Sequence, residues 1–152
     1  MPAPFLRCCL MSPMKYEDIK IGEIYSFNRK ISKKDVLVFA KLTGDFNALH
    51  VNEIFGRKSI FKKNVVHGML VGSLFSTLVG MHCPGENGLY LSQSLNFKSP
   101  LFYEDEVTVR GTVIDKNDSV KVLVLKTEIL RDGKITIQGE ARVKILDEVL
   151  DK

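Results

Sequence analysis

The sequence predicts a single α+β domain in which an antiparallel sheet curves around one buried helix. The chain has 152 residues, 45% hydrophobic and 26% charged, which suits one globular domain with a substantial core. An apolar run with helical spacing occupies 68–81, and the segments after residue 88 alternate as strands do. A helix that is apolar on every side implies that the sheet encloses it, and the open sheet edges favour a homodimer or dimer-based oligomer.

The first 14 residues differ from the rest, because they contain three prolines, no acid and no periodicity. We expect 1–14 to be a disordered, targeting or upstream segment and the domain to span 15–152. A cytoplasmic location is expected, or a mitochondrial one if 1–14 act as a presequence.

Capping signals define the elements before the apolar run. Residues 24–31 read as a strand, and Ser32 follows as a helix N-cap, with Asp35 placed to complete a capping box. Gly44 stands where a left-handed C-cap would end that helix. A further short helix is expected at 53–58.

The helix at 68–81 carries small residues four positions apart, at Gly68, Gly72, Ser76 and Gly80. Glycine inside a helix costs about 0.5–1 kcal/mol relative to alanine, so this stripe predicts close packing against a sheet or another backbone.

The C-terminal half predicts about four antiparallel strands. Residues 89–97 alternate as one strand, and the β-branched segments 107–113, 120–130 and 135–145 follow. Asn117-Asp118 and Asp132-Gly133 are two-residue hairpin signals.

Composition excludes several classes of function. A net charge of +4, with no RNA-binding or zinc-finger pattern, gives no support for nucleic-acid binding. The apolar run is shorter than the roughly 20 residues of a membrane span. The cysteines, at 8, 9 and 83, form no disulfide framework and indicate a reducing compartment. His82 and Cys83 lack partners at metal spacing, so we expect no metal, and the sequence indicates no cofactor.

Two stretches carry possible chemistry. Asp45 and His50 place an acid and an imidazole five residues apart, although such a pair is more often structural, and Asn47 looks like a turn former. His67-Gly68 opens the apolar helix, where an unobstructed N–H can face an oxyanion. Ser76 lies on the glycine stripe, and its hydroxyl has a simpler role in bonding the preceding turn.

Together these residues resemble a known family. The stretch 45–50, DFNALH, is similar to the D-x-N-P-[LI]-H motif of the MaoC-like (R)-specific enoyl-CoA hydratases, with Ala48 in place of the usual proline. Two later stretches, VHGML at 66–70 and SLFS at 73–76, resemble that family's helix entry. Its next strand and turn are resembled by YLSQSLNF at 90–97, followed by Pro100 and 105–107. The resemblance runs from about 19 to 145 and implies the hot-dog fold.

The resemblance also implies roles. Asp45 and His50 would activate water at the β-carbon of a trans-2-enoyl thioester carried by coenzyme A or acyl carrier protein. Which of the two is acid or base stays open. The Gly68 N–H would hold the thioester oxygen, and Ser76 would help position Asp45 or line the site. Substrate contacts would include Asn47, His67, Leu70, Tyr90 and Gln93.

Three alternatives remain. The substrate could be an acyl-carrier-protein thioester undergoing dehydration. The chain could be a hot-dog thioesterase, which the Asp…His motif argues against. It could also be a non-catalytic domain that binds acyl thioesters, which loss of Asp45 or His50 would have favoured.

Overall fold

The computed structural model describes residues 13–147 and 149. The predicted disorder of 1–14 therefore lies mostly outside the described residues. Met14 already belongs to the fold, because Asn87 Nδ2 donates a hydrogen bond of 2.9 Å to its carbonyl. A short 3-10 turn, η1 (Tyr16–Asp18), follows. Within the described ranges, no helix has the length and apolar character needed to cross a membrane.

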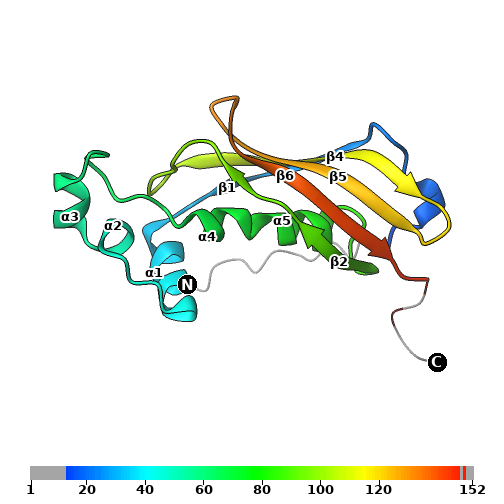
Figure 1. The fold of residues 1–152 in the computed structure, drawn as a ribbon, viewed down its shortest axis with the longest axis horizontal. Helices are drawn as coiled ribbons and strands as arrows, with labels where there is room; N and C mark the ends of the chain where they lie inside the picture. The colour runs from blue at the N-terminus through cyan, green and yellow to red at the C-terminus, as the bar shows by residue number, and fades with distance from the viewer. Residues whose placement is uncertain (1–12, 148, 150–152) are drawn as a thin grey trace, which may run out of the picture.

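A six-stranded antiparallel sheet forms one layer of the molecule (Figure 1). Its strand order is β1-β4-β5-β6-β2. The short β3 also pairs with β6, at residues 137–138, whereas β2 pairs with residues 141–145. The strands are β1 (Ile24–Lys30), β2 (Gly88–Gln93), β3 (Asn96–Phe97), β4 (Glu106–Asn117), β5 (Val122–Arg131) and β6 (Lys134–Ile145). Register shifts interrupt three of the pairings, and such bulges increase the twist and bend of a sheet.

The central helical segment lies against one face of this sheet (Figure 1). It consists of α4 (Gly68–Gly72), α5 (Leu74–Thr77) and a π-helical turn, η2 (Leu78–His82). Val71, Phe75 and Leu78 are buried toward the sheet. The predicted helix and the predicted α+β hot-dog arrangement are confirmed.

The prediction that this helix is buried on every side is wrong for a single chain. Met69 is 59% exposed and Met81 52%, and Ser73, Ser76 and Gly80 are exposed as well. These positions share one side of the helix, and the sheet of one protomer covers only the other side.

The small-residue stripe packs closely at its beginning only. A Cβ on Gly68 would lie 2.8 Å from Phe97 Cε1, and one on Gly72 would lie 3.0 Å from Leu95 Cδ1. A Cβ on Gly80 would meet nothing within 4 Å. The stripe therefore rotates away from the sheet along the helix.

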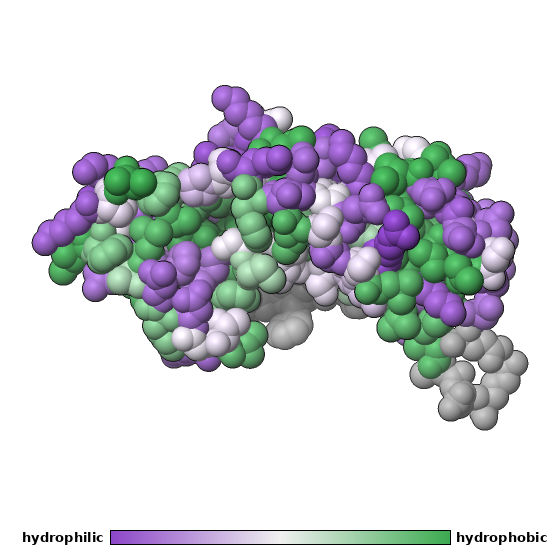
Figure 2. All heavy atoms as spheres, viewed as in Figure 1, coloured by the Kyte–Doolittle hydropathy of each residue, from purple (hydrophilic) through white to green (hydrophobic). Residues whose placement is uncertain are grey.

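Three helices precede the central segment and form one end of the molecule (Figure 1). Helix α1 (Lys33–Thr43) begins with the predicted capping box between Ser32 and Asp35, and Gly44 ends it with φ of 80°. The short helices α2 (Ala48–Val51) and α3 (Glu53–Lys58) follow. Hydrophobic and charged side chains share the surface at this end (Figure 2).

Two strand predictions need correction. The segment 89–97 is not one strand, because Ser94 leaves the ladder and its carbonyl oxygen takes the space beside Gly139. Asn117-Asp118 is not a two-residue turn, since Asn117 still pairs with Val122 and the turn spans 118–121. The Asp132-Gly133 turn is confirmed, with both residues at positive φ, 51° and 74°.

Candidate active site

Helix α2, which carries His50, is held firmly despite its length of four residues. Asn64 is buried, and its Nδ2 donates to the carbonyls of Leu49 and Asn52 at 2.9 Å each. The Tyr103 hydroxyl donates to the His50 carbonyl. Burial raises the pKa of Tyr103, which keeps this hydroxyl a neutral donor. The backbone around His50 is therefore fixed from two sides.

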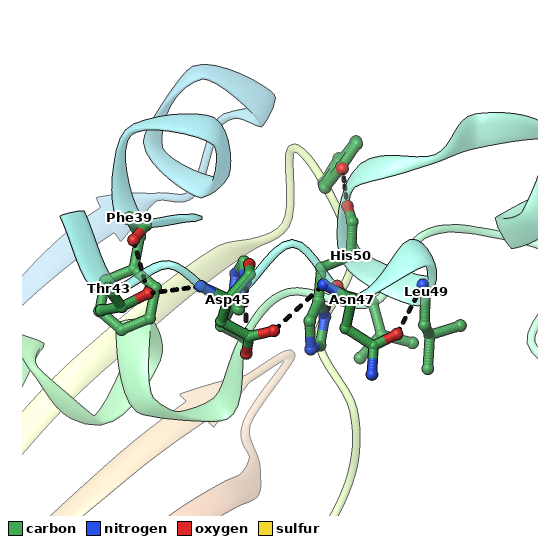
Figure 3. Close-up of polar contacts among 9 residues, drawn as sticks. Phe39, Thr43, Asp45, Asn47, Leu49 and His50 are labelled. Carbon is green, nitrogen blue, oxygen red and sulfur yellow. Dashed lines mark hydrogen bonds and ion pairs between the residues drawn. The ribbon is translucent and has the colours of Figure 1, made fainter. Parts of the chain in front are cut away.

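The Asp45 loop is ordered by a chain of local hydrogen bonds (Figure 3). Asp45 N–H donates to Thr43 Oγ1 at 3.3 Å, and Asp45 Oδ1 accepts from the Asn47 N–H at 3.1 Å. Asn47 Oδ1 in turn caps α2 by accepting from the Leu49 N–H at 3.0 Å. The turn-forming role of Asp45 is thus real, but it occupies one carboxylate oxygen only.

The second oxygen of Asp45 points toward His67. Asp45 Oδ2 lies 3.7 Å from His67 Nε2, and that nitrogen is also 3.0 Å from the Asp45 carbonyl oxygen. The Asp45 side chain is 50% exposed, whereas that of His67 is 3% exposed. One face of the acid is therefore supported by a buried ring and the other faces solvent.

His50 presents a defined nitrogen. Its Nδ1 lies 2.7 Å from the carbonyl oxygen of Val65. Because a carbonyl only accepts hydrogen bonds, Nδ1 carries the proton, and in the neutral ring Nε2 keeps its lone pair. Figure 3 shows the Asp45 carboxylate and the His50 ring on the same side of the loop.

Asp45, His50 and His67 form one cluster, in which a ligand atom from each lies within 4.8 Å of the others. These atoms are close enough to hold a cation. One nitrogen of each imidazole, however, already donates a hydrogen bond to a backbone carbonyl. The expected absence of a metal stays a prediction.

An apolar cavity of about 310 Å³ opens beside this cluster. His50 and Gly68 reach it from the two predicted stretches, and Lys98 and Ser99 add polar groups. Its other lining residues are Val65, Val66, Val71, Phe97, Pro100, Leu101 and Ile137. A predominantly apolar cavity with an imidazole in its wall suits a small hydrophobic substrate carrying a reactive polar group.

The structure brings together four of the predicted site residues, namely Asp45, His50, His67 and Gly68. Asn47 is close in sequence and serves as the N-cap of α2.

The other four lie elsewhere. Ser76 is exposed on α5 and does not line the cavity, and Leu70 lines a separate pocket of about 60 Å³. The Tyr90 hydroxyl donates to Gln93 Oε1 at 2.6 Å, and Gln93 Nε2 donates to buried Thr127 at 2.9 Å. Burial raises the pKa of Tyr90 to about 12. This pair ties β2 to the middle of the sheet, outside the cavity wall.

The sequence did not identify the segment 97–101 as part of the site. Phe97 and Pro100 belong to the resemblance, but nothing in their spacing indicated a cavity wall. The available signal was the breaker pair Ser99-Pro100, which ends the strand pattern and lets the chain turn beside Val66.

Comparison with known proteins places this geometry in a family. The model of the MaoC like domain matches residues 18–139. The chain belongs to the MaoC-like family. It is 37% identical over 133 residues to an (R)-specific enoyl-CoA hydratase of Aeromonas caviae, a match that covers 87% of this chain and 99% of the relative.

One solved structure and one further relative of this MaoC-like chain are informative. The solved (R)-hydratase from A. caviae superposes with a TM-score of 0.83 at 37% identity, covering 86% of this chain and 99% of the other. A mitochondrial 3-hydroxyacyl-[acyl-carrier-protein] dehydratase of Arabidopsis thaliana is 32% identical over 127 residues, which are 81% of this chain and 75% of that protein.

Proposed function

We propose that this MaoC-like chain adds water reversibly to a trans-2-enoyl thioester, giving the (R)-3-hydroxyacyl thioester. The observation that carries the proposal is that His50 and Gly68 line an apolar cavity and that a ligand atom of Asp45 lies within 4.8 Å of one of His50. An imidazole in an apolar cavity wall, with a carboxylate beside it, matches a substrate whose apolar chain carries its reactive carbons next to a polar thioester.

The reaction needs one proton removed and one returned. The water oxygen bonds to the β-carbon while its proton passes to the Asp45/His50 pair, and the α-carbon takes a proton from the same pair. The neutral tautomer of His50 offers Nε2 to the water, and Asp45 keeps one carboxylate oxygen free of the turn. The two groups share protons, so the roles of acid and base belong to the pair.

The thioester oxygen gains negative charge as the bond to water forms. The backbone N–H of Gly68, at the first position of α4, is the proposed donor to this oxygen. A single donor of this kind is typically worth about 2.7–4 kcal/mol in the transition state. A side chain at Gly68 would also collide with Phe97, which forms the facing wall of the cavity.

Ser76 keeps its proposed role only if it acts from a second protomer. In one chain it is exposed on the same side of the central helix as Met69 and Met81. That side, together with the edge strand β2, forms the proposed homodimer contact, since Leu89 and Leu91 of β2 are 48% and 52% exposed.

Acyl carrier protein is the second candidate carrier. A surface pocket of about 270 Å³ contains Arg57, Lys62 and Lys63, and these cations suit either the phosphates of coenzyme A or an acidic carrier protein. The Arabidopsis relative is named for the carrier-protein substrate and as mitochondrial. For this chain we propose a cytoplasmic or mitochondrial location.

The proposal is tested by mixing the protein with crotonyl-CoA and following the loss of enoyl absorbance. Turnover is expected to fall by about 10²-fold or more in Asp45→Asn and in His50→Ala, because each removes a proton-transfer group. Ile60→Ser is a suitable control, since Ile60 is 88% exposed outside the cavity. Full activity in both site variants, or none in the wild type with any chain length on either carrier, would refute it.

Product analysis separates the alternatives. A thioesterase releases free thiol, which a thiol-reactive dye detects, whereas a hydratase leaves the thioester intact. An (R)-specific 3-hydroxyacyl dehydrogenase should consume the product and an (S)-specific one should not.

A further inference from the structure

His67 touches both proposed reacting residues and is almost completely buried. Its side chain is 3% exposed, and its Nε2 lies 3.0 Å from the Asp45 carbonyl oxygen and 3.7 Å from Asp45 Oδ2. The centre of its ring is 4.0 Å from that of His50, with an interplanar angle of 31°. Phe39 of α1 packs on the ring at 5.1 Å. Little of its surface is left to contact a substrate directly.

The hydrogen bond to the Asp45 carbonyl fixes the tautomer. A carbonyl oxygen only accepts, so Nε2 of His67 must carry the hydrogen. His67 Nδ1 is buried and has no hydrogen-bond partner among the described residues. A proton on Nδ1 would be an unpaired buried donor on a charged ring, which is costly. The surroundings therefore suit a neutral ring protonated on Nε2.

We propose that His67 is a positioning residue that orders the Asp45 loop against the His50 ring and stays neutral while it does so. The proposal rests on the proposed hydration, since it assigns a role in that reaction. It replaces the substrate contact expected from the sequence. The ring meets two titratable side chains, Asp45 and His50, and the uncharged Phe39.

The location of His67 explains both how it positions Asp45 and why its ring should be neutral. Asp45 lies on an exposed loop, and the bond to His67 ties that loop to the start of the central helix, beside Gly68. A positive His67 would attract the Asp45 carboxylate and oppose a proton on His50, 4.0 Å away between ring centres, and would weaken both groups in proton transfer. A neutral donor holds the loop without this penalty.

Two substitutions separate positioning from other roles. His67→Phe removes the donor but keeps a ring, whereas His67→Gln places an amide N–H near the former Nε2. We expect His67→Phe to lower kcat about 10²-fold with little change in KM, because misplacing a reacting group costs on that order. His67→Gln should recover most of the lost kcat and keep the wild-type pH profile. His82→Asn is the control, since His82 stacks on Phe27 at 4.8 Å and does not line the cavity.

The opposite outcomes are distinct. If His67 contacted the substrate, both variants would show a raised KM. If His67 carried a proton in the reaction, His67→Gln would be as inactive as His67→Phe. Either result would overturn the proposal. A thermal melt of each variant identifies loss of folding.

A second measurement needs no turnover. The chain has three histidines, so ¹⁵N NMR of the imidazoles, assigned with His82→Asn, can resolve the tautomer of each ring. We expect His67 to be neutral and protonated on Nε2 at neutral pH, and His50 to carry its proton on Nδ1. A charged His67, or one protonated on Nδ1, would overturn the proposal even if the wild type proved inactive on enoyl thioesters.

Discussion

Ala48 shows how a single residue of the site motif acts through the backbone. It occupies the first position of α2, directly after the N-cap Asn47. Proline is favoured at that position because its fixed φ suits a helix start and its missing N–H has no helical partner. Asn47, with φ of −52° and ψ of 129°, already has the extended conformation that a following proline requires.

Ala48→Pro is therefore expected to stabilise the fold by about 0.4–1 kcal/mol and to raise Tm by about 1–4 °C. Hydratase activity should be retained, because no reacting group changes. Leu49→Pro is the matched control, since the Leu49 N–H donates to Asn47 Oδ1 and its loss should lower Tm. Calorimetry checks both, and a lower Tm for Ala48→Pro would mean that the start of α2 is not as described.

At the scale of elements, the meeting of β2, β3 and β6 sets the wall of the cavity. Ser94 leaves the ladder, its N–H donates to the Glu140 carbonyl at 2.9 Å, and the chain re-enters pairing at Asn96. A Cβ on Gly139 would lie only 1.7 Å from the Ser94 carbonyl oxygen. Glycine at 139 is what allows this break, which brings Phe97 to the cavity.

Gly139→Ala should therefore destabilise the protein by about 1–3 kcal/mol, since backbone must move to accommodate the methyl group. Gly111→Ala is the graded comparison, because its Cβ would meet the end of the flexible Leu78 side chain at 2.7 Å. Denaturant unfolding should show the larger loss for Gly139→Ala. Equal losses would indicate that Ser94 moves aside readily.

Local signals explain what the sequence could predict at this scale. Ser32, Asp35 and Gly44 define α1 within a few residues of chain, and Asp132-Gly133 defines a turn by its own backbone preference. The Ser94 break has no such signal, because it depends on Gly139, which lies 45 positions away along the chain. The strand pattern of 89–97 alone therefore predicted one strand.

The site residues likewise divide into those placed by local signals and those placed by packing between distant parts of the chain. Asp45 lies in the loop after α1 and His50 lies five residues later in the capped helix α2, so their meeting is a local event. Leu70 and Ser76 depend on the rotation of the central helix against the sheet, which side-chain types do not specify when both sides of the helix carry apolar residues. The cavity wall at 97–101 depends on strand pairing across the molecule for the same reason.

At the scale of the whole molecule, the core divides into two clusters along the central helix. One contains Val66, Phe75 and Ile137 and supports the site, whereas the other contains Leu123 and Val143 at the far end of the sheet. Both lie between the helix and the sheet. Among the described residues of one chain, no such cluster covers the opposite side of the helix, and this asymmetry accounts for the exposed Met69 and Met81.

The final prediction concerns what covers that side. Met81 and Leu91 are each 52% exposed, on the central helix and on the edge strand β2, and a second copy of the chain would bury both apolar surface and an unpaired strand edge.

Light scattering coupled to size-exclusion chromatography should show a dimer for the wild type. Met81→Lys and Leu91→Lys should shift the mass toward the monomer, because lysine is costly to bury without a partner. Ile60→Lys, at an 88% exposed position, should leave the dimer intact. If Ser76 completes the site from the second protomer, activity should fall with the dimer fraction, and a fully active monomer would show that each site is complete within one chain.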